Sequence, residues 1–264
     1  MANDNIENIR AQFTRQAETY AAWVQASDAA AHARTVEICS PALNDRVLDV
    51  ACGPGFLTMS FAPCCATVVG LDATDALLAL AQAEAERRGI KNVRFERGLA
   101  TALPFDDASF DIAVCRAAFH HFPEPDRVLS EMRRVIRPAG KIMTADFITS
   151  DDPSEAEAHN EIERLCDPSH VKALTGTEFR EIYRKHGLRI ISDLTRRLHY
   201  DLDEWIIHGG PVPEIEAEIR LRFQQALKQD GTGLHVRQEE GKIRFTHQTL
   251  MIIGVSAAGM PVPG

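Results

Sequence analysis

The segment from Val47 to Thr58 constrains the fold of this chain more than any other. It begins with an apolar run, Val47 to Val50, that is short enough to form a buried parallel strand. The run breaks at Gly53-Pro54-Gly55, where glycines permit a tight turn and let a ligand approach the backbone. A second apolar run ends at Asp72, at about the spacing at which a dinucleotide fold places its ribose-binding carboxylate. We therefore predict a β-α-β unit that binds a nucleoside.

The residues of the loop indicate which nucleoside this unit binds. A pyrophosphate-binding fingerprint, G-x-G-x-x-G, needs a third glycine, and Thr58 occupies that position here. Asp49 lies at the junction of strand and loop, where its carboxylate would repel a diphosphate and attract a cationic amine. A ligand with ribose hydroxyls, an ammonium group and no phosphate fits these residues better. S-adenosylmethionine is such a ligand.

Four segments in sequence order, over residues ~45 to ~148, resemble motifs of the class I S-adenosylmethionine-dependent methyltransferases, which is far more specific than one glycine loop. They are Asp49-Val-Ala-Cys-Gly-Pro-Gly55, Gly70-Leu-Asp-Ala-Thr74, Leu103-Pro-Phe-Asp-Asp-Ala-Ser-Phe-Asp111 and Arg134-Val-Ile-Arg-Pro-Ala-Gly-Lys141. The most similar subgroup contains small-molecule methyltransferases of quinone biosynthesis and their natural-product relatives. The resemblance implies an α/β, Rossmann-like, doubly wound fold with a seven-stranded, mostly parallel sheet, an antiparallel last strand and a helical lid or cap. It also implies S-adenosyl-L-methionine as cofactor and S-adenosyl-L-homocysteine as product.

The resemblance assigns cofactor contacts to loops at the carboxyl ends of the strands. Asp72 is expected to bind the ribose hydroxyls, and the loop glycines are expected to bind the methionyl part. The family often has Gly-Asp-Ala after the third strand, whereas this chain has Gly98-Leu99-Ala100, so adenine recognition would fall to backbone near Ala100 and to apolar packing. The full set of candidate cofactor residues is Tyr20, Asp49, Ala51, Gly53, Gly55, Asp72, Ala73, Ala100 and Arg116.

Two adjacent histidines, His120 and His121, follow the predicted fourth strand. Adjacent residues point in different directions and no third ligand has a helpful spacing, so we expect the chain to hold no metal. A histidine can act as a general base because its pKa lies near neutrality. Similar natural-product O-methyltransferases use a histidine and an acid, which correspond to His120 and Asp146. Which of the two histidines faces the site stays open, and packing is the alternative role for each.

The chain is expected to divide into three parts. Residues 1–40 would form an N-terminal helical lid, because Phe13-Thr-Arg-Gln-Ala-Glu-Thr-Tyr20 resembles an entry segment that folds over the cofactor in this subgroup. Residues 41–150 would form the cofactor-binding core. Residues 151–264 would complete the sheet with strands at Arg189 to Leu194 and Thr249 to Val255. An insertion at about 198–245 would cap the substrate.

Composition excludes several other classes of protein. A net charge of −9 argues against nucleic acid as a partner, because binding to nucleic acid relies on basic surface. No window approaches 18 uninterrupted apolar residues and the N-terminus does not resemble a signal peptide, so we expect no membrane insertion and a cytoplasmic location. The resemblance is compatible with a homodimer.

These observations favour methyl transfer from S-adenosylmethionine to an oxygen, nitrogen or carbon atom of a small-molecule acceptor, a metabolite or natural product. One alternative is a protein that binds the cofactor without methylating, as a cyclase or a regulator. Another is an NAD(P)-dependent oxidoreductase, which the missing third glycine and Asp49 disfavour. The sequence does not name the acceptor.

Overall fold

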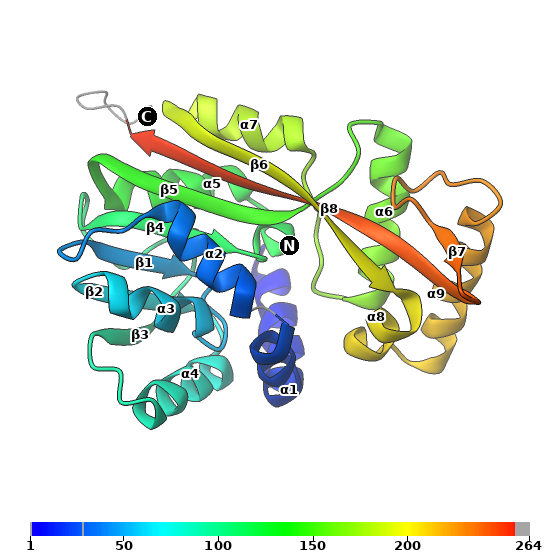
Figure 1. Ribbon diagram of the computed structural model, residues 1–264, viewed down its shortest axis with the longest axis horizontal. Helices are drawn as coiled ribbons and strands as arrows, with labels where there is room; N and C mark the ends of the chain where they lie inside the picture. Colours follow the sequence, from blue (N-terminus) through cyan, green and yellow to red (C-terminus); the bar gives the residue numbers. More distant parts are fainter. Residues whose placement is uncertain (1, 28, 257–264) are drawn as a thin grey trace.

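The computed structural model describes residues 2–27 and 29–256 and shows a twisted sheet covered by helices on both faces (Figure 1). The strand order is β3-β2-β1-β4-β5-β8-β6, and a short β7 pairs with β8. β1 to β5 pair in parallel, whereas β8 is antiparallel to both β5 and β6. The predicted Rossmann-like sheet with its antiparallel last strand is therefore confirmed. The strands are β1 (Arg46–Val50), β2 (Thr67–Asp72), β3 (Val93–Arg97), β4 (Phe110–Arg116), β5 (Ile136–Ile148), β6 (Leu188–Asp201), β7 (Arg237–Glu239) and β8 (Lys242–Ser256).

Side chains of the central strands alternate between two apolar layers, as the pleat of a strand requires. Leu48 and Val69 enter a cluster that includes residues of α5 and α7 on one face. Val47 and Val68 enter a cluster that includes residues of α2 and α3 on the other face. The helices are α1 (Ala2–Ser27), α2 (Ala29–Cys39), α3 (Phe56–Phe61), α4 (Asp75–Arg87), α5 (Pro125–Val135), α6 (Pro153–Cys166), α7 (Gly176–Lys185), α8 (Leu202–Gly209) and α9 (Pro213–Ala226). Within residues 2–27 and 29–256, no helix is long and apolar enough to cross a membrane.

β6 and β8 extend well past the central sheet and carry a second lobe (Figure 1). They remain paired with each other to Asp201 and Arg244, and α6, α8, α9 and β7 gather around this outer end. The outer lobe has its own apolar cluster, formed by Ile162, Cys166, Leu202, Ile206, Ile219, Phe223, Leu234 and Phe245. We call these elements, with the outer ends of β6 and β8, the cap.

The strand ends predicted from the sequence for β6 and β8 were wrong, because both strands are longer than predicted. The predicted strands, 189–194 and 249–255, cover only the parts that pair within the central sheet. Residues 193–199 of β6 are all exposed, because this segment crosses from the core to the cap. An exposed ribbon lacks the apolar run by which a buried strand is found. The cap also contains α6, which precedes the insertion predicted at about 198–245. The predicted division of the chain into three parts stays a prediction.

α1 connects the two lobes. The guanidinium Nε of Arg10 donates a hydrogen bond to the carbonyl of Ala73 in the core, at 3.0 Å. The side-chain amide of Gln16 donates to the carbonyl of Gly209 in the cap, at 3.2 Å. The helix therefore lies over the edge of the sheet at which β1, β2 and β4 end (Figure 1).

Candidate active site

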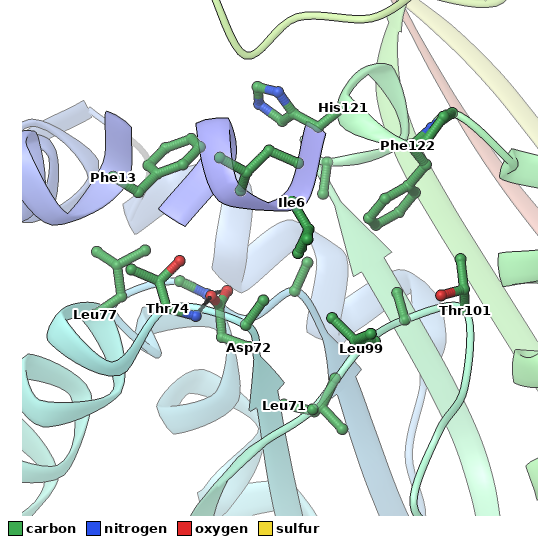
Figure 2. A pocket seen from close by; sticks show the side chains of 18 of the residues that line it. Ile6, Phe13, Leu71, Asp72, Thr74, Leu77, Leu99, Thr101, His121 and Phe122 are labelled. Carbon is green, nitrogen blue, oxygen red and sulfur yellow. Dashed lines mark hydrogen bonds between the residues drawn. The ribbon is translucent and has the colours of Figure 1, made fainter. Parts of the chain in front are cut away.

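A cavity of about 340 Å³ lies beyond the carboxyl ends of β1 and β2, below α1. We call it the nucleoside cavity. In Figure 2, Ile6 and Phe13 of α1 lie on one side of it, and Asp72, Thr74 and Leu99 lie opposite. Six of the predicted cofactor residues line it: Tyr20, Ala51, Gly53, Asp72, Ala73 and Ala100. The position agrees with the rule that open parallel sheets bind ligands at the carboxyl ends of their strands.

The Asp72 carboxylate joins the two loops that form the floor of this cavity. Its Oδ2 accepts a hydrogen bond from the backbone N–H of Gly53, and its Oδ1 accepts one from that of Thr74, both at 2.9 Å. Burial raises the pKa of Asp72, and these backbone donors oppose that rise. Each carboxylate oxygen can accept a further hydrogen bond, so the group can still receive hydroxyl donors from a ligand.

The two loop glycines face different surroundings. Both have positive φ angles, 54° at Gly53 and 75° at Gly55, which glycine adopts without strain. A Cβ at Gly53 would approach only the Tyr20 ring, at 3.7 Å, on the cavity side. A Cβ at Gly55 would lie 2.6 Å from the Phe95 ring and 2.8 Å from the Ala81 methyl group. Gly53 is thus open to a ligand, whereas Gly55 allows helix and strand to pack closely and lines none of the cavities described here.

A smaller cavity, of about 50 Å³, lies around Asp49 and Arg116. Asp49 is 1% exposed, and its Oδ2 accepts a hydrogen bond of 2.6 Å from the hydroxyl of Thr58. Burial raises the pKa of Asp49 to about 7, against the opposing effect of this bond. A cation near Asp49 would therefore favour its ionised form. Thr58, the residue that replaces the third glycine, holds this carboxyl group, a role that the sequence reasoning did not assign.

A third cavity, of about 200 Å³, lies between α2 and the strands β4, β5, β6 and β8. We call it the acceptor cavity. Tyr20 and Ala117 line it as well as both other cavities, so all three meet around these two residues. Arg116 and Asp146 line it as well. Sequence reasoning missed several of its other residues, because β6 and β8 contribute them from far along the chain: Leu194, Arg196, Leu198, Tyr200, His247, Thr249, Leu250 and Met251.

His120 and Asp146 form a close pair at the ends of neighbouring strands. Nδ1 of His120 lies 2.8 Å and 3.0 Å from the two carboxylate oxygens of Asp146, and the backbone N–H of His120 donates to Oδ2 at 3.2 Å. The His120 side chain is 11% exposed and that of Asp146 is 1% exposed. Burial acts to lower the pKa of His120, but the charge of Asp146 and the hydrogen bond outweigh burial and raise it above its ordinary value. The same pairing holds the pKa of Asp146 below its ordinary value.

His121 has a different environment from His120. It lines the nucleoside cavity, and its Nδ1 lies 3.1 Å from the carbonyl oxygen of Ser169. Burial lowers the pKa of His121 to about 4. Of the two histidines, His121 lines the nucleoside cavity, and His120, which lines none of the three cavities, is the one paired with an acid that lines the acceptor cavity.

Comparison with known proteins identifies the class to which this fold and site belong. A family described as "Methyltransferase domain" matches residues 42–187, which include the glycine loop, Asp72 and the His120–Asp146 pair. The chain belongs to this family, the class I S-adenosylmethionine-dependent methyltransferases. The protein is a methyltransferase.

Among individual relatives, the chain is similar to the uncharacterized methyltransferase YcgJ of Bacillus subtilis, with 32% identity over 80% of this chain and 84% of that protein. The crystal structure of YcgJ superposes with a TM-score of 0.79 and 29% identity, covering 86% of this chain and 98% of that one. The chain is also 37% identical to a demethylmenaquinone methyltransferase of Thermus thermophilus over 43% of this chain and 52% of that protein. A 27-O-demethylrifamycin SV methyltransferase of Amycolatopsis mediterranei is 30% identical over 54% of each chain.

Proposed function

We propose that the protein binds S-adenosylmethionine in the nucleoside cavity and transfers its methyl group to a small molecule held in the acceptor cavity. The observation that carries this proposal is the convergence of three cavities on Tyr20 and Ala117. The Asp72 carboxylate and the open backbone at Gly53 suit a ribose and its attached chain, and Asp49 with Arg116 suits an amino-acid end group. S-adenosylmethionine, when bound, supplies a methyl group on a sulfonium, so that no acid is needed for the leaving group.

We further infer that the acceptor reacts through an oxygen atom that carries a proton. Because Nδ1 of His120 is directed at Asp146, Nε2 is the nitrogen left to take a proton. A base of this kind is needed for a hydroxyl acceptor and not for a free amine. Relatives named for demethylmenaquinone and for the 27-O position of demethylrifamycin support a small-molecule acceptor.

Replacing Asp72 by alanine is expected to weaken S-adenosylmethionine binding by about 2 kcal/mol, roughly 30-fold in Kd, because the ribose hydroxyls lose a charged acceptor. The Asp75→Ala variant is the matched control: the Asp75 side chain is 72% exposed and does not line the nucleoside cavity. Calorimetric titration of both folded variants with S-adenosylmethionine measures the effect. Equal affinity of Asp72→Ala and wild type for S-adenosylmethionine would show that Asp72 does not contact the cofactor. If the protein bound NADH tightly and not S-adenosylmethionine, the oxidoreductase alternative would be favoured.

The backbones of α1 and α8 are expected to exchange hydrogen more slowly when cofactor and acceptor are bound. α1 carries Tyr20 over all three cavities and contacts α8 through Gln16. Ligands that contact this helix would therefore hold it closed and exclude water. Hydrogen exchange with and without S-adenosylhomocysteine measures this, with α7 as an internal control that packs on the sheet away from the cavities. Identical exchange of α1 in both states would make it an ordinary packing helix.

A further inference from the structure

Three side chains from two elements converge at the boundary between the central sheet and the cap. His159 and Glu163 lie one helical turn apart on α6, and His247 lies on β8. All three residues are buried, with exposed fractions of 2%, 7% and 5% respectively. Oε1 of Glu163 lies 3.4 Å from Nε2 of His159 and 2.9 Å from Nε2 of His247. One ligand atom from each residue lies within 4.8 Å of the other two.

These atoms lie within ion-pair distance of one another but make no hydrogen bond of good geometry. Nε2 of His159, Oε1 of Glu163 and Nε2 of His247 are each buried without a partner in hydrogen-bond geometry, although they face one another. A buried polar atom left unsatisfied costs roughly 1–3 kcal/mol, so three at one point need an explanation. A cation bound between them would satisfy all three at once.

The 3.4 Å separation of Glu163 Oε1 from His159 Nε2 suits a metal ion, whereas the 2.9 Å separation from His247 Nε2 would have to widen slightly to admit one. Ligands at about 2.0–2.2 Å from a common Zn²⁺ in tetrahedral arrangement lie roughly 3.3–3.5 Å apart. Two imidazoles and one carboxylate are a donor set typical of zinc and of non-haem iron sites. Burial lowers the pKa of His159, which favours the neutral imidazole that binds metal.

We propose that His159, Glu163 and His247 bind one divalent transition-metal ion, for which Zn²⁺ is the probe. The expectation that the chain holds no metal was based on His120 and His121 and did not consider this cluster. Such an ion would fasten α6 of the cap to β8. Because His247 also lines the acceptor cavity, the ion would lie at the wall of that cavity. The Phe147 ring lies between this cluster and the His120–Asp146 pair, with its centroid 5.1 Å from that of His247 and 4.6 Å from that of His120.

The test uses the full chain without a histidine tag, stripped with EDTA, exchanged into chelator-free buffer, incubated with ZnCl₂ and desalted. Mass-spectrometric metal analysis is expected to find one retained Zn²⁺ per chain. Competition with a chromophoric chelator is expected to show a loss of affinity on the order of 10²-fold or more in Glu163→Gln and in His247→Gln. These substitutions nearly keep side-chain size, and a cooperative thermal melt of each variant checks that it is folded. His199→Ala is the matched control, because His199 is exposed on β6, its ring nitrogen hydrogen-bonds the Thr246 hydroxyl and it lies outside the cluster.

Two further measurements separate this site from other metal binding. Zn²⁺ is expected to raise the Tm of wild type and of His199→Ala but not that of Glu163→Gln. The Co²⁺-loaded protein is expected to lack thiolate-to-metal absorption, because all six cysteines lie outside the cluster. Wild type that retains no Zn²⁺ would overturn the proposal. Equal retention by wild type and both cluster variants would do so too, as would a thiolate band on Co²⁺ loading.

Discussion

Replacing His120 by alanine is expected to lower turnover by ~10²- to 10⁴-fold while cofactor affinity changes little. In the proposed mechanism, the Asp146 carboxylate would hold Nδ1 of His120 protonated and would stabilise the imidazolium formed when Nε2 takes the acceptor's proton. Neither residue lines the nucleoside cavity, so binding of the cofactor does not depend on them directly. Steady-state turnover and calorimetric cofactor binding, measured on the same preparation, separate the two effects. His199→Ala again serves as the control.

The pH dependence of turnover tests the same pair in a way that loss of packing would not. A base acts in its deprotonated form, so the rate should rise with pH through the pKa of His120. Asp146 raises that pKa, and Asp146→Asn removes the charge responsible. The acidic limb of the pH–rate profile should therefore move to lower pH in Asp146→Asn, while the maximal rate falls. Rates near wild type in both variants across pH would contradict the role of a general base. His120 and Asp146 would then only pack, and the enzyme would act by positioning an amine or a pre-ionised acceptor.

Replacing Gly55 by valine is expected to cost on the order of 3 kcal/mol or more in the free energy of unfolding. The new side chain would clash with Phe95 and Ala81, and it would occupy a backbone conformation with a φ of 75° that valine tolerates poorly. The expectation from sequence, that this glycine admits the methionyl part of the cofactor, is not supported by the direction in which its Cβ would point.

Gly89 supplies the matched control for this substitution. Its φ is 69°, close to that of Gly55, but a Cβ there would meet nothing within 4 Å. Gly89→Val therefore isolates the backbone strain, about 1–2 kcal/mol, from the clash. Urea denaturation of the two variants measures the difference. Equal destabilisation by both would show that the interior around Gly55 accommodates the side chain.

Gly53→Ala should instead weaken cofactor binding, because its Cβ would face the nucleoside cavity.

The central sheet could be predicted from sequence because its signals are local. The apolar run before Gly53 and the acid at the end of β2 each lie within one element, and the structure puts Asp72 at the cavity as expected. The pairing of His120 with Asp146 followed from two strand ends expected to be neighbours, and β4 does pair with β5. What Gly55 contacts could not be predicted, because it depends on where β3 places Phe95.

The cap and the acceptor cavity could not be predicted in the same way. β6 and β8 leave the sheet as an exposed ribbon, so no apolar run marks their full length. Tyr200 and His247 reach the acceptor cavity through the pairing of these two strands, which no local pattern specifies. His159 and Glu163 have the four-residue spacing of one helical face, a signal that gained meaning only when the fold brought His247 beside them.

Methyl transfer itself is tested most directly with S-adenosylmethionine that carries a trideuterated methyl group. The protein is incubated with this donor and with pools of hydroxyl-bearing small molecules, and the products are analysed by mass spectrometry. The expected result is a product heavier than its acceptor by one trideuterated methyl group, formed in equal amount with S-adenosylhomocysteine and formed ~10²- to 10⁴-fold more slowly by His120→Ala. If an acceptor were converted without isotope while the donor remained intact, the cofactor would have a non-methylating role and the proposed methyl transfer to a small molecule would be contradicted.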